Sequence, residues 1–396
     1  MNTDPSQTYL SPIANSLKSP TKSPLKTPPR ALFSFKSPWI SSLLGSPLKA
    51  ALTFLILAIC VWLLPPLVDW AFVHAVFRAD PQACQDARGV GACWGVVREK
   101  YSMILWGRYP YADHWRAQLS SALLVVLIIK STVKPGGLRR TLLEWCVIFG
   151  LIYILMSGHL GPFEFLRSAV IVPLIGQPFS VVPSDLWGGL PLTLILSVVC
   201  TVTACPLAVL LALGRTSPMP IFSVVSKVYI EVLRGVPLIS VLFMASYMFP
   251  LLLPNGYSPD VLIRVVLGIS LFAAAYLAEI VRAGLQALQK GQFDAASSLG
   301  LGYWQTQYLV VLPQALKIVI PGLVNSFIAI FKDTSLITIV SLYELTGSLT
   351  LALNGDPLWR PFKLEGYFFI TLIYFIFCFS MSRYSLWLER RLNHSL

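Results

Sequence analysis

Charged residues are scarce in this chain of 396 residues: Asp, Glu, Lys and Arg together make up 12% of it. Ordinary soluble domains carry about 25% charged residues. Hydrophobic residues account for 56% of the chain, above the roughly 45–50% of soluble domains. This composition excludes an ordinary soluble globular protein and predicts an all-α, polytopic membrane protein.

Several catalytic and metal-binding patterns are also missing. There is no Gly-x-x-x-x-Gly-Lys-Ser/Thr loop, so the chain cannot hydrolyse ATP by that chemistry. The four histidines are scattered at positions 74, 114, 159 and 394, and no His or Cys cluster has metal-ligand spacing. No set of nucleophile, base and orienting group stands out. We therefore expect no catalytic residues, no metal site and no cofactor bound by this chain itself.

Long apolar runs predict about eight membrane-spanning helices, because a crossing needs about 20 mostly apolar residues. The runs cover residues 50–68, 117–131, 141–157, 188–213, 236–254, 262–281, 315–333 and 366–385. An even number of crossings places both termini on one side. Nineteen of the thirty Lys and Arg residues then fall in segments on the side of the termini, which the positive-inside rule assigns to the cytoplasm.

The N-terminal 48 residues differ from the rest. They combine scattered Lys with repeated Ser-Pro and Thr-Pro pairs and hold a single acid, Asp4. Such composition predicts a disordered, basic cytoplasmic tail. Its aromatic residues lie apart from its main run of lysines and it has no binding fold, so we expect membrane lipids rather than nucleic acid as its partner.

Residues 49–185 are predicted to hold the first membrane helices, with an extracytoplasmic loop at about 77–116. Two of the seven cysteines, Cys84 and Cys93, lie in this loop. We expect them to form a disulfide, since such bonds persist outside the cytoplasm. The other five lie in apolar helices, where free cysteine behaves as a small hydrophobic residue.

A polar insert, Gln289 to Pro313, interrupts the apolar C-terminal half. Its sequence predicts a helix, a turn at Gly300 and a second helix, with Trp304 presented to a partner and Pro313 at the entry to the next membrane helix. The simpler alternative is an ordinary amphipathic hairpin between membrane spans.

The insert resembles the signature loop of ABC importer permeases: Glu-Ala-Ala, three residues, Gly, nine residues, Ile, one residue, Leu-Pro. Asp294 stands in place of Glu and Val310 in place of Ile. In that family the loop carries a coupling helix that docks on a cytoplasmic ATPase. The resemblance implies this role for residues 290–306, within a coupling loop at about 286–313. The residues concerned are Asp294, Ala295, Ala296, Gly300, Trp304, Leu312 and Pro313.

Segments 231–239, 275–284 and 332–336 resemble polar amino-acid permeases of the histidine and glutamine type. The front half, with Ala92-Cys93-Trp94 and Gly107-Arg108-Tyr109-Pro110, is similar to the longer permease subunits of general L-amino-acid transporters. These resemblances imply a five-helix core at 186–396 in a bacterial inner membrane. They also imply three partners: a second permease subunit, an ATPase dimer that binds ATP and Mg, and an extracytoplasmic amino-acid-binding protein.

Charged residues within the predicted core need partners or a function, because they are costly in a membrane. Glu231 and Arg234 are three residues apart, as are Glu279 and Arg282. At that helical spacing each pair can neutralise itself, so we interpret them as structural ion pairs.

A polar cluster near the end of the seventh predicted span is the candidate substrate pathway. An amino acid needs donors for its carboxylate and an acidic group or carbonyls for its ammonium. Lys332 and Asp333 diverge around a helix, so one can face the pathway while the other does not. The alternative is that these residues simply end the helix in water. The candidates are Asn325, Ser326, Lys332, Asp333, Thr334 and Ser335.

Ion-coupled secondary transport of small polar solutes is the alternative function. Pro191, Pro206, Pro237 and Pro321 are compatible with the broken helices of such transporters. However, the chain shows no repeated half, and this alternative leaves the polar insert without a role.

Overall fold

The structure is a computed structural model that describes residues 46–133, 136–159, 180–254 and 258–393. The chain divides into two compact units, Met1–Leu67 and Val68–Leu396. The predicted tail lies almost entirely outside the described residues. The described part of the first unit is the helix α2 (Pro47–Val68), whose last residue begins the second unit; none of its 22 residues is buried within the protein.

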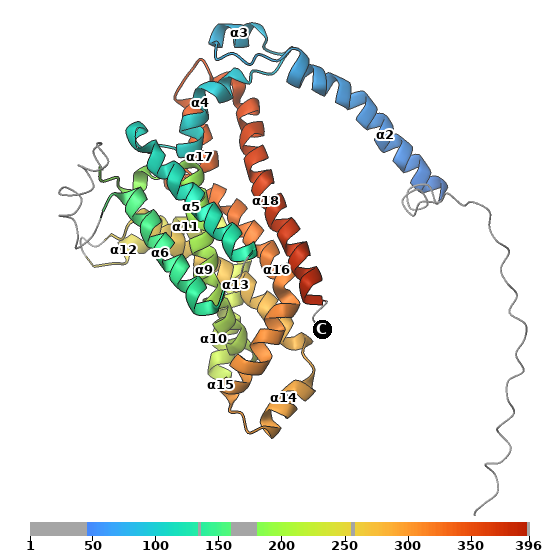
Figure 1. Ribbon diagram of the computed structural model, residues 1–396, viewed down its shortest axis with the longest axis vertical. Coiled ribbons are helices and arrows are strands. Elements are labelled where there is room, and N and C mark those ends of the chain that lie inside the picture. Colours follow the sequence, from blue (N-terminus) through green and yellow to red (C-terminus); the bar gives the residue numbers. More distant parts are fainter. Residues whose placement is uncertain (1–45, 134–135, 160–179, 255–257, 394–396) are drawn as a thin grey trace, which may run out of the picture. The chain divides into compact units, whose positions relative to one another are not determined.

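The second unit begins with two short helices, α3 (Pro81–Asp86) and α4 (Gly95–Trp106). The long helices α5 (His114–Val133) and α6 (Leu138–Ser157) follow and pack against each other (Figure 1). Arg116 of α5 is fully buried, and its Nε donates to the carbonyl oxygen of Leu155 at 2.6 Å. Because helix C-termini carry partial negative charge, this arginine stabilises the end of α6.

The centre of the second unit is built from α9 (Gly189–Thr216), α13 (Val261–Ala287) and α16 (Leu312–Asp333). The helix α13 packs against both α9 and α16. Small residues allow this close approach, as is usual for membrane helices: Ala204, Ala208 and Ala212 of α9 and Ala274 and Ala278 of α13 are at most 1% exposed. The last helix, α18 (Lys363–Asn393), packs along α16.

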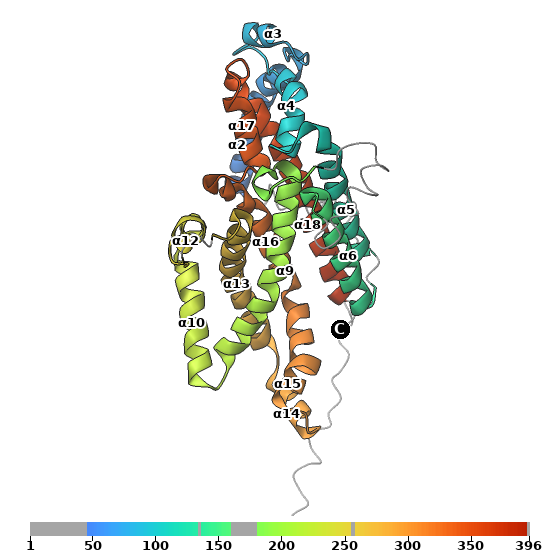
Figure 2. The same ribbon diagram turned by 90° about the vertical axis from the view of Figure 1, so that its left-hand side faces the viewer.

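The segment between α9 and α13 corrects one prediction. We predicted a single crossing at 236–254, whereas the structure has a helix α10 (Pro220–Gly235) that packs beside α9 (Figure 2). The chain then bends by 104° into α11 (Leu238–Phe243), a π-helical turn at Met244–Met248 and α12 (Phe249–Leu251). Pro237 explains the bend, because proline lacks an N–H and forces the preceding Val236 into extended backbone.

Seven helices of the described chain are long and apolar enough to cross a membrane, or eight if the bent pair of α10 and α11–α12 counts as one span. This confirms the predicted all-α membrane architecture with about eight crossings. Residues of the polar insert form α14 (Lys290–Ser298) and α15 (Tyr303–Gln305). After α16, a 3₁₀ turn at Thr334–Val340 leads to α17 (Leu345–Asn354), which packs against α4, α9 and α18.

Candidate functional site

The polar insert begins with α14, whose end is set by Gly300. This glycine has φ +74°, a left-handed conformation that L side chains rarely adopt. Its N–H donates to the Ser297 carbonyl at 2.9 Å, and the Leu301 N–H donates to the Ala296 carbonyl at 3.2 Å. These two bonds make a Schellman motif. The helix therefore ends at Gly300, as the sequence predicts.

The base of α14 is fixed to the helix bundle. Phe293 packs into an apolar cluster formed by the ends of α9, α13 and α16, which includes Leu213, Leu285 and Ala315. Gln314 of α16 donates through Nε2 to Oε1 of Gln292 at 3.0 Å. Packing and hydrogen bonding therefore both join α14 to the membrane helices.

The outer surface of the insert is exposed and partly aromatic. Leu299 is 80% exposed, Trp304 is 68% exposed and Tyr308 is 71% exposed, whereas Ala296 is only 2% exposed. Asp294 and Ala295 also lie on the exposed side. Exposed aromatic residues of this kind are enriched at protein interfaces.

A π-helical turn at Thr306–Val311 connects α15 to α16. The partly buried Leu312 follows it as the first residue of α16, and Pro313 is the second. Pro313 has no N–H and cannot donate to the carbonyl of Leu309. The π-helical turn, which is wider than an α-helical turn, lies where this helical hydrogen bond is missing. A cavity of about 480 Å³ lies behind this turn, lined by Phe293, Ser297, Leu301 and residues from α9, α13, α15 and the π-helical turn.

A second cavity, of about 300 Å³, lies between α11, α13 and α16; we call it the Asp333 cavity. Its polar lining residues are Asp333, Ser326 and Tyr276, and Phe272 adds a second aromatic ring. One carboxylate with two aromatic rings and apolar walls suits a ligand that has a cationic group and an apolar part.

The structure brings only two of the six predicted pathway residues, Ser326 and Asp333, to this cavity. Asn325 and Lys332 are exposed elsewhere on α16. Thr334 is fully buried and donates to the Phe331 carbonyl at 2.8 Å, and Ser335 is half-buried. Adjacent residues lie about 100° apart around a helix, which explains why Lys332 and Asp333 diverge.

Charged residues of α9, α10 and α13 meet at Glu279 in an arrangement we call the Glu279 network. Arg282 donates to Glu279 Oε2 through Nη2 at 2.9 Å, consistent with the predicted pair. Arg215 Nη1 lies 2.7 Å from Glu279 Oε1 and forms an ion pair with it, although the angles between the two groups do not meet those of a hydrogen bond. Arg234 Nη1 lies 3.8 Å from Oε2 of the same carboxylate.

The predicted pair of Glu231 and Arg234 is wrong. Glu231 instead lies 3.7 Å from Arg215 of the neighbouring helix α9, while Arg234 turns to Glu279 and to the ring of Tyr276, 5.5 Å from its centre. The spacing of the two residues in sequence allows the pair. In the folded chain, however, Arg234 lies near the less exposed carboxylate of Glu279 and the aromatic face of Tyr276.

Comparison of the sequence with known proteins identifies the family of this chain. Residues 204–394 match the family of binding-protein-dependent transport system inner membrane components. The inner membrane amino-acid ABC transporter permease protein YhdY of Escherichia coli is 48% identical over 340 residues, covering 84% of this chain and 88% of that protein. The chain belongs to the amino-acid ABC transporter permeases.

A second relative of the permease is the glutamate/glutamine/aspartate/asparagine transport system permease protein BztC of Rhodobacter capsulatus. It is 37% identical over 405 residues, covering 89% of this chain and 92% of that protein. Among solved structures, an amino acid ABC transporter with histidines aligns with 50% of this chain and 90% of its own, at 29% identity and a TM-score of 0.44. The family model and the two relatives show that the permease is a subunit of an ABC importer for amino acids, and is itself not the ATPase.

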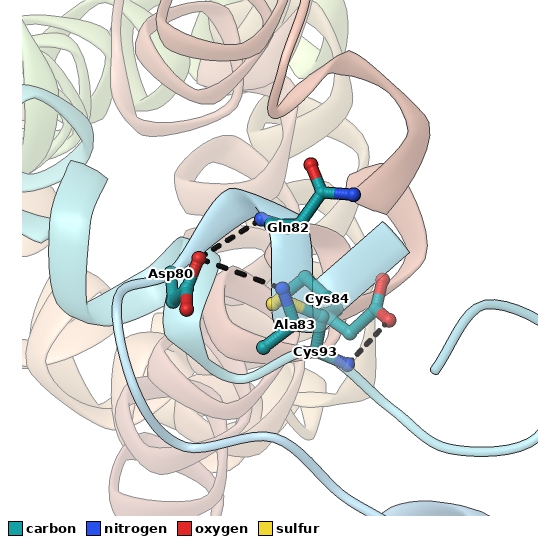
Figure 3. Close-up of a disulfide and its surroundings, with 6 residues drawn as sticks. Asp80, Gln82, Ala83, Cys84 and Cys93 are labelled. Atoms are coloured by element: carbon teal, nitrogen blue, oxygen red, sulfur yellow. Dashed lines mark hydrogen bonds between the residues drawn. A yellow bond between two sulfur atoms is a disulfide. The ribbon is translucent and has the colours of Figure 1, made fainter. Parts of the chain in front are cut away.

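The permease has a compact layer at the end opposite α14, formed by α3, α4 and α17 (Figure 1). Cys84 and Cys93 are joined there by a disulfide, and both are fully buried (Figure 3). Asp80 caps α3 by accepting from the Gln82 N–H at 3.0 Å. The Cys93 N–H donates to Glu365 Oε1 at 2.9 Å, which joins this layer to the start of α18.

Two carboxylates near this end have shifted pKa values. The hydrogen bond from Lys100 Nζ, 2.7 Å from Asp356 Oδ2, lowers the pKa of Asp356. Burial raises the pKa of Glu344, against hydrogen bonds that lower it. Neither Asp356 nor Lys100 was singled out from the sequence, because they are 256 residues apart along the chain.

The sequence reasoning also missed Arg215 and Tyr276. Arg215 follows an uncharged run and is the natural partner for an acid on another membrane helix. Tyr276 lies inside the quoted segment 275–284, but only the structure shows that it lines the Asp333 cavity and contacts Arg234. It joins the cavity to the Glu279 network.

Proposed function

We propose that the permease imports amino acids by alternating access, driven by a separate ATPase dimer that binds ATP and Mg. The observation that carries this proposal is the polar insert: α14 presents an exposed surface with Leu299, Trp304 and Tyr308, while Phe293 anchors it to three membrane helices. Closure of the ATPase subunits moves α14, and the membrane helices rock with it. Asp294, Ala295, Ala296, Gly300, Trp304, Leu312 and Pro313 are the proposed coupling residues.

The proposed substrate pathway passes the Asp333 cavity. The carboxylate of Asp333 binds the ammonium group of the amino acid, and the Ser326 hydroxyl provides a neutral hydrogen bond. Thr334 and Ser335 shape the turn beside it, whereas Asn325 and Lys332 are exposed on α16 and do not line this cavity. Relatives that transport polar amino acids, such as BztC by its name, support this substrate class.

The proposed orientation places both termini and α14 in the cytoplasm of a bacterium, with the permease in the inner membrane. Arg215 and Arg282 lie near the ends of α9 and α13 that pack against α14, as the positive-inside rule expects. The disulfide lies at the opposite end, where an extracytoplasmic environment would preserve it. The proposed partners are a second, homologous permease subunit and an extracytoplasmic amino-acid-binding protein.

Uptake by proteoliposomes tests the proposal. They contain the permease, its co-expressed subunits and the binding protein, with labelled amino acids as substrates. We expect uptake to require ATP, and uptake driven by an ion gradient alone would support a secondary transporter instead. Gly300→Val, which forces a branched side chain into a left-handed backbone, should abolish uptake.

Gly291→Val is the matched control, because Gly291 lies within α14, the helix that Gly300 ends, and has open space around it and no positive φ. It should retain uptake. If Gly300→Val transported normally while the ATPase remained bound, the coupling role of α14 would be wrong.

A further inference from the structure

Glu344 is a fully buried carboxylate at the start of α17. Its Oε1 accepts hydrogen bonds from the N–H groups of Thr346 and Gly347, each at 2.9 Å, and from the Thr338 hydroxyl at 3.4 Å. These bonds satisfy free N–H groups in the first turn of the helix. To this extent Glu344 is a helix N-cap.

The second oxygen of Glu344 has a role that capping does not require. Its Oε2 accepts a hydrogen bond from the hydroxyl of Tyr374, in the middle of α18, at 2.8 Å. Helix N-caps are usually the shorter Ser, Thr, Asp or Asn. The longer glutamate reaches both helices and so ties the start of α17 to α18.

Tyr374 extends this connection to α16. Its ring packs against the ring of Phe331, with 5.3 Å between the ring centres. Phe331 is 3% exposed, and its carbonyl accepts the hydrogen bond from Thr334. Asp333 lies between these two residues in sequence, so a shift of Phe331 moves the Asp333 carboxylate.

We propose that Glu344 and Tyr374 are positioning residues that hold Asp333 in the orientation needed to bind the transported amino acid. Neither residue lines the Asp333 cavity; both act through Phe331. Glu344 fixes the Tyr374 hydroxyl, Tyr374 fixes the Phe331 ring, and Phe331 sets the last turn of α16. This inference rests on the proposed substrate pathway and adds residues of α17 and α18 to it.

Binding to the complete transporter in nanodiscs, without the binding protein, tests the inference. The probe is the radiolabelled amino acid that the wild-type complex takes up fastest. Tyr374→Phe removes one oxygen and keeps the ring, so we expect assembly to be intact and Kd to rise by about three- to tenfold. Glu344→Gln keeps the shape of the side chain and should raise Kd in the same direction.

Tyr109→Phe is the matched control. The Tyr109 hydroxyl is also buried and donates to the carbonyl of Met156 at 2.9 Å, but it lies among α4, α5 and α6. If loss of a buried hydroxyl only destabilises the protein, Tyr109→Phe and Tyr374→Phe will lower Tm alike and leave Kd unchanged. That result would overturn the positioning role.

A double-mutant cycle with Asp333→Asn separates the two proposals. If Tyr374 acts through Asp333, Tyr374→Phe will add little to the Kd of Asp333→Asn. Fully additive effects would overturn the inference, as would a normal Kd for Tyr374→Phe beside a raised Kd for Asp333→Asn. If Asp333→Asn itself binds normally, the proposed substrate pathway fails, and the inference fails with it.

Discussion

Arg264 on α13 donates a hydrogen bond through Nη1 to the main-chain carbonyl of Ser246. Pro250 lies four residues after Ser246, and without an N–H it cannot donate to that carbonyl. An unsatisfied carbonyl costs several kcal/mol in a membrane. Arg264 therefore supplies the hydrogen-bond donor that Pro250 lacks. This contact explains a charged residue near the start of an apolar helix that the sequence analysis left without a role.

Arg264→Met should therefore destabilise the permease by about 1.5–3 kcal/mol, the range for a hydrogen bond to a charged group. Thermal unfolding in detergent would show a lower Tm. Pro250→Ala restores a main-chain N–H, and in that background Arg264→Met should have a smaller effect. Equal losses in both backgrounds would show that Arg264 does not act through the Ser246 carbonyl.

Glu279→Gln should destabilise the helix bundle, because it leaves three arginines around a neutral side chain. The Glu279 side chain is 16% exposed, so the loss should lie below the 3–5 kcal/mol of a fully buried pair, at about 1–3 kcal/mol. Glu231→Gln is the matched control: Glu231 is 68% exposed, and its pair should contribute less than about 1 kcal/mol. Similar Tm losses for both variants would contradict a network centred on Glu279.

The Glu279 network also shows what could be predicted from the sequence. Helix lengths, the turn at Gly300 and the divergence of Lys332 from Asp333 follow from local rules of composition and helical spacing. The partner of Glu231 does not, because Arg215 reaches it only after α9 and α10 fold back on each other. The predicted crossing at 236–254 failed for a related reason: its apolar composition suited a span, but Pro237 bends the chain.

In the candidate site, too, features set by neighbouring residues could be predicted, and features set by contacts between distant helices could not. The spacing of the polar insert was sufficient to predict α14 and its end, because a Schellman motif depends on neighbouring residues. Only part of the Asp333 cavity could be predicted. The sequence singled out Ser326 and Asp333 on α16, but not the lining residues that α11 and α13 contribute. Whether Lys332 or Asp333 faces it depends on how α16 is rotated against α13, and the sequence alone does not define that rotation.

Reduction of the disulfide between Cys84 and Cys93 should destabilise the layer of α3, α4 and α17. The two residues are nine apart, and closing so short a loop contributes about 2–3 kcal/mol. Reductant should lower the Tm of the wild-type permease. It should have no effect on a Cys84→Ser, Cys93→Ser double variant, which starts at the lower value.

A second double variant, Cys60→Ser with Cys146→Ser, controls for other effects of the reductant, since both of these cysteines are free and exposed. It should respond to reductant as the wild type does. A wild-type Tm that is insensitive to reductant at a concentration shown to free both thiols would contradict the stabilising role.

The ion pair of Lys100 and Asp356 predicts a pH dependence. The pKa of Asp356 is lowered from 3.8 by its hydrogen bond to Lys100, so the folded state favours the ionised carboxylate. Its stabilising effect is complete above the unfolded pKa and disappears as the pH falls through the lower, folded pKa. Asp356→Asn should have a lower Tm than the wild type at pH 7, and the two values should begin to converge only as the pH falls below about 4, the ordinary pKa of an aspartate. Glu99→Gln, which changes an exposed acid on α4, should show no such convergence. A Tm difference for Asp356→Asn that stays constant from pH 7 to pH 3 would mean that the ion pair does not stabilise this end of the permease.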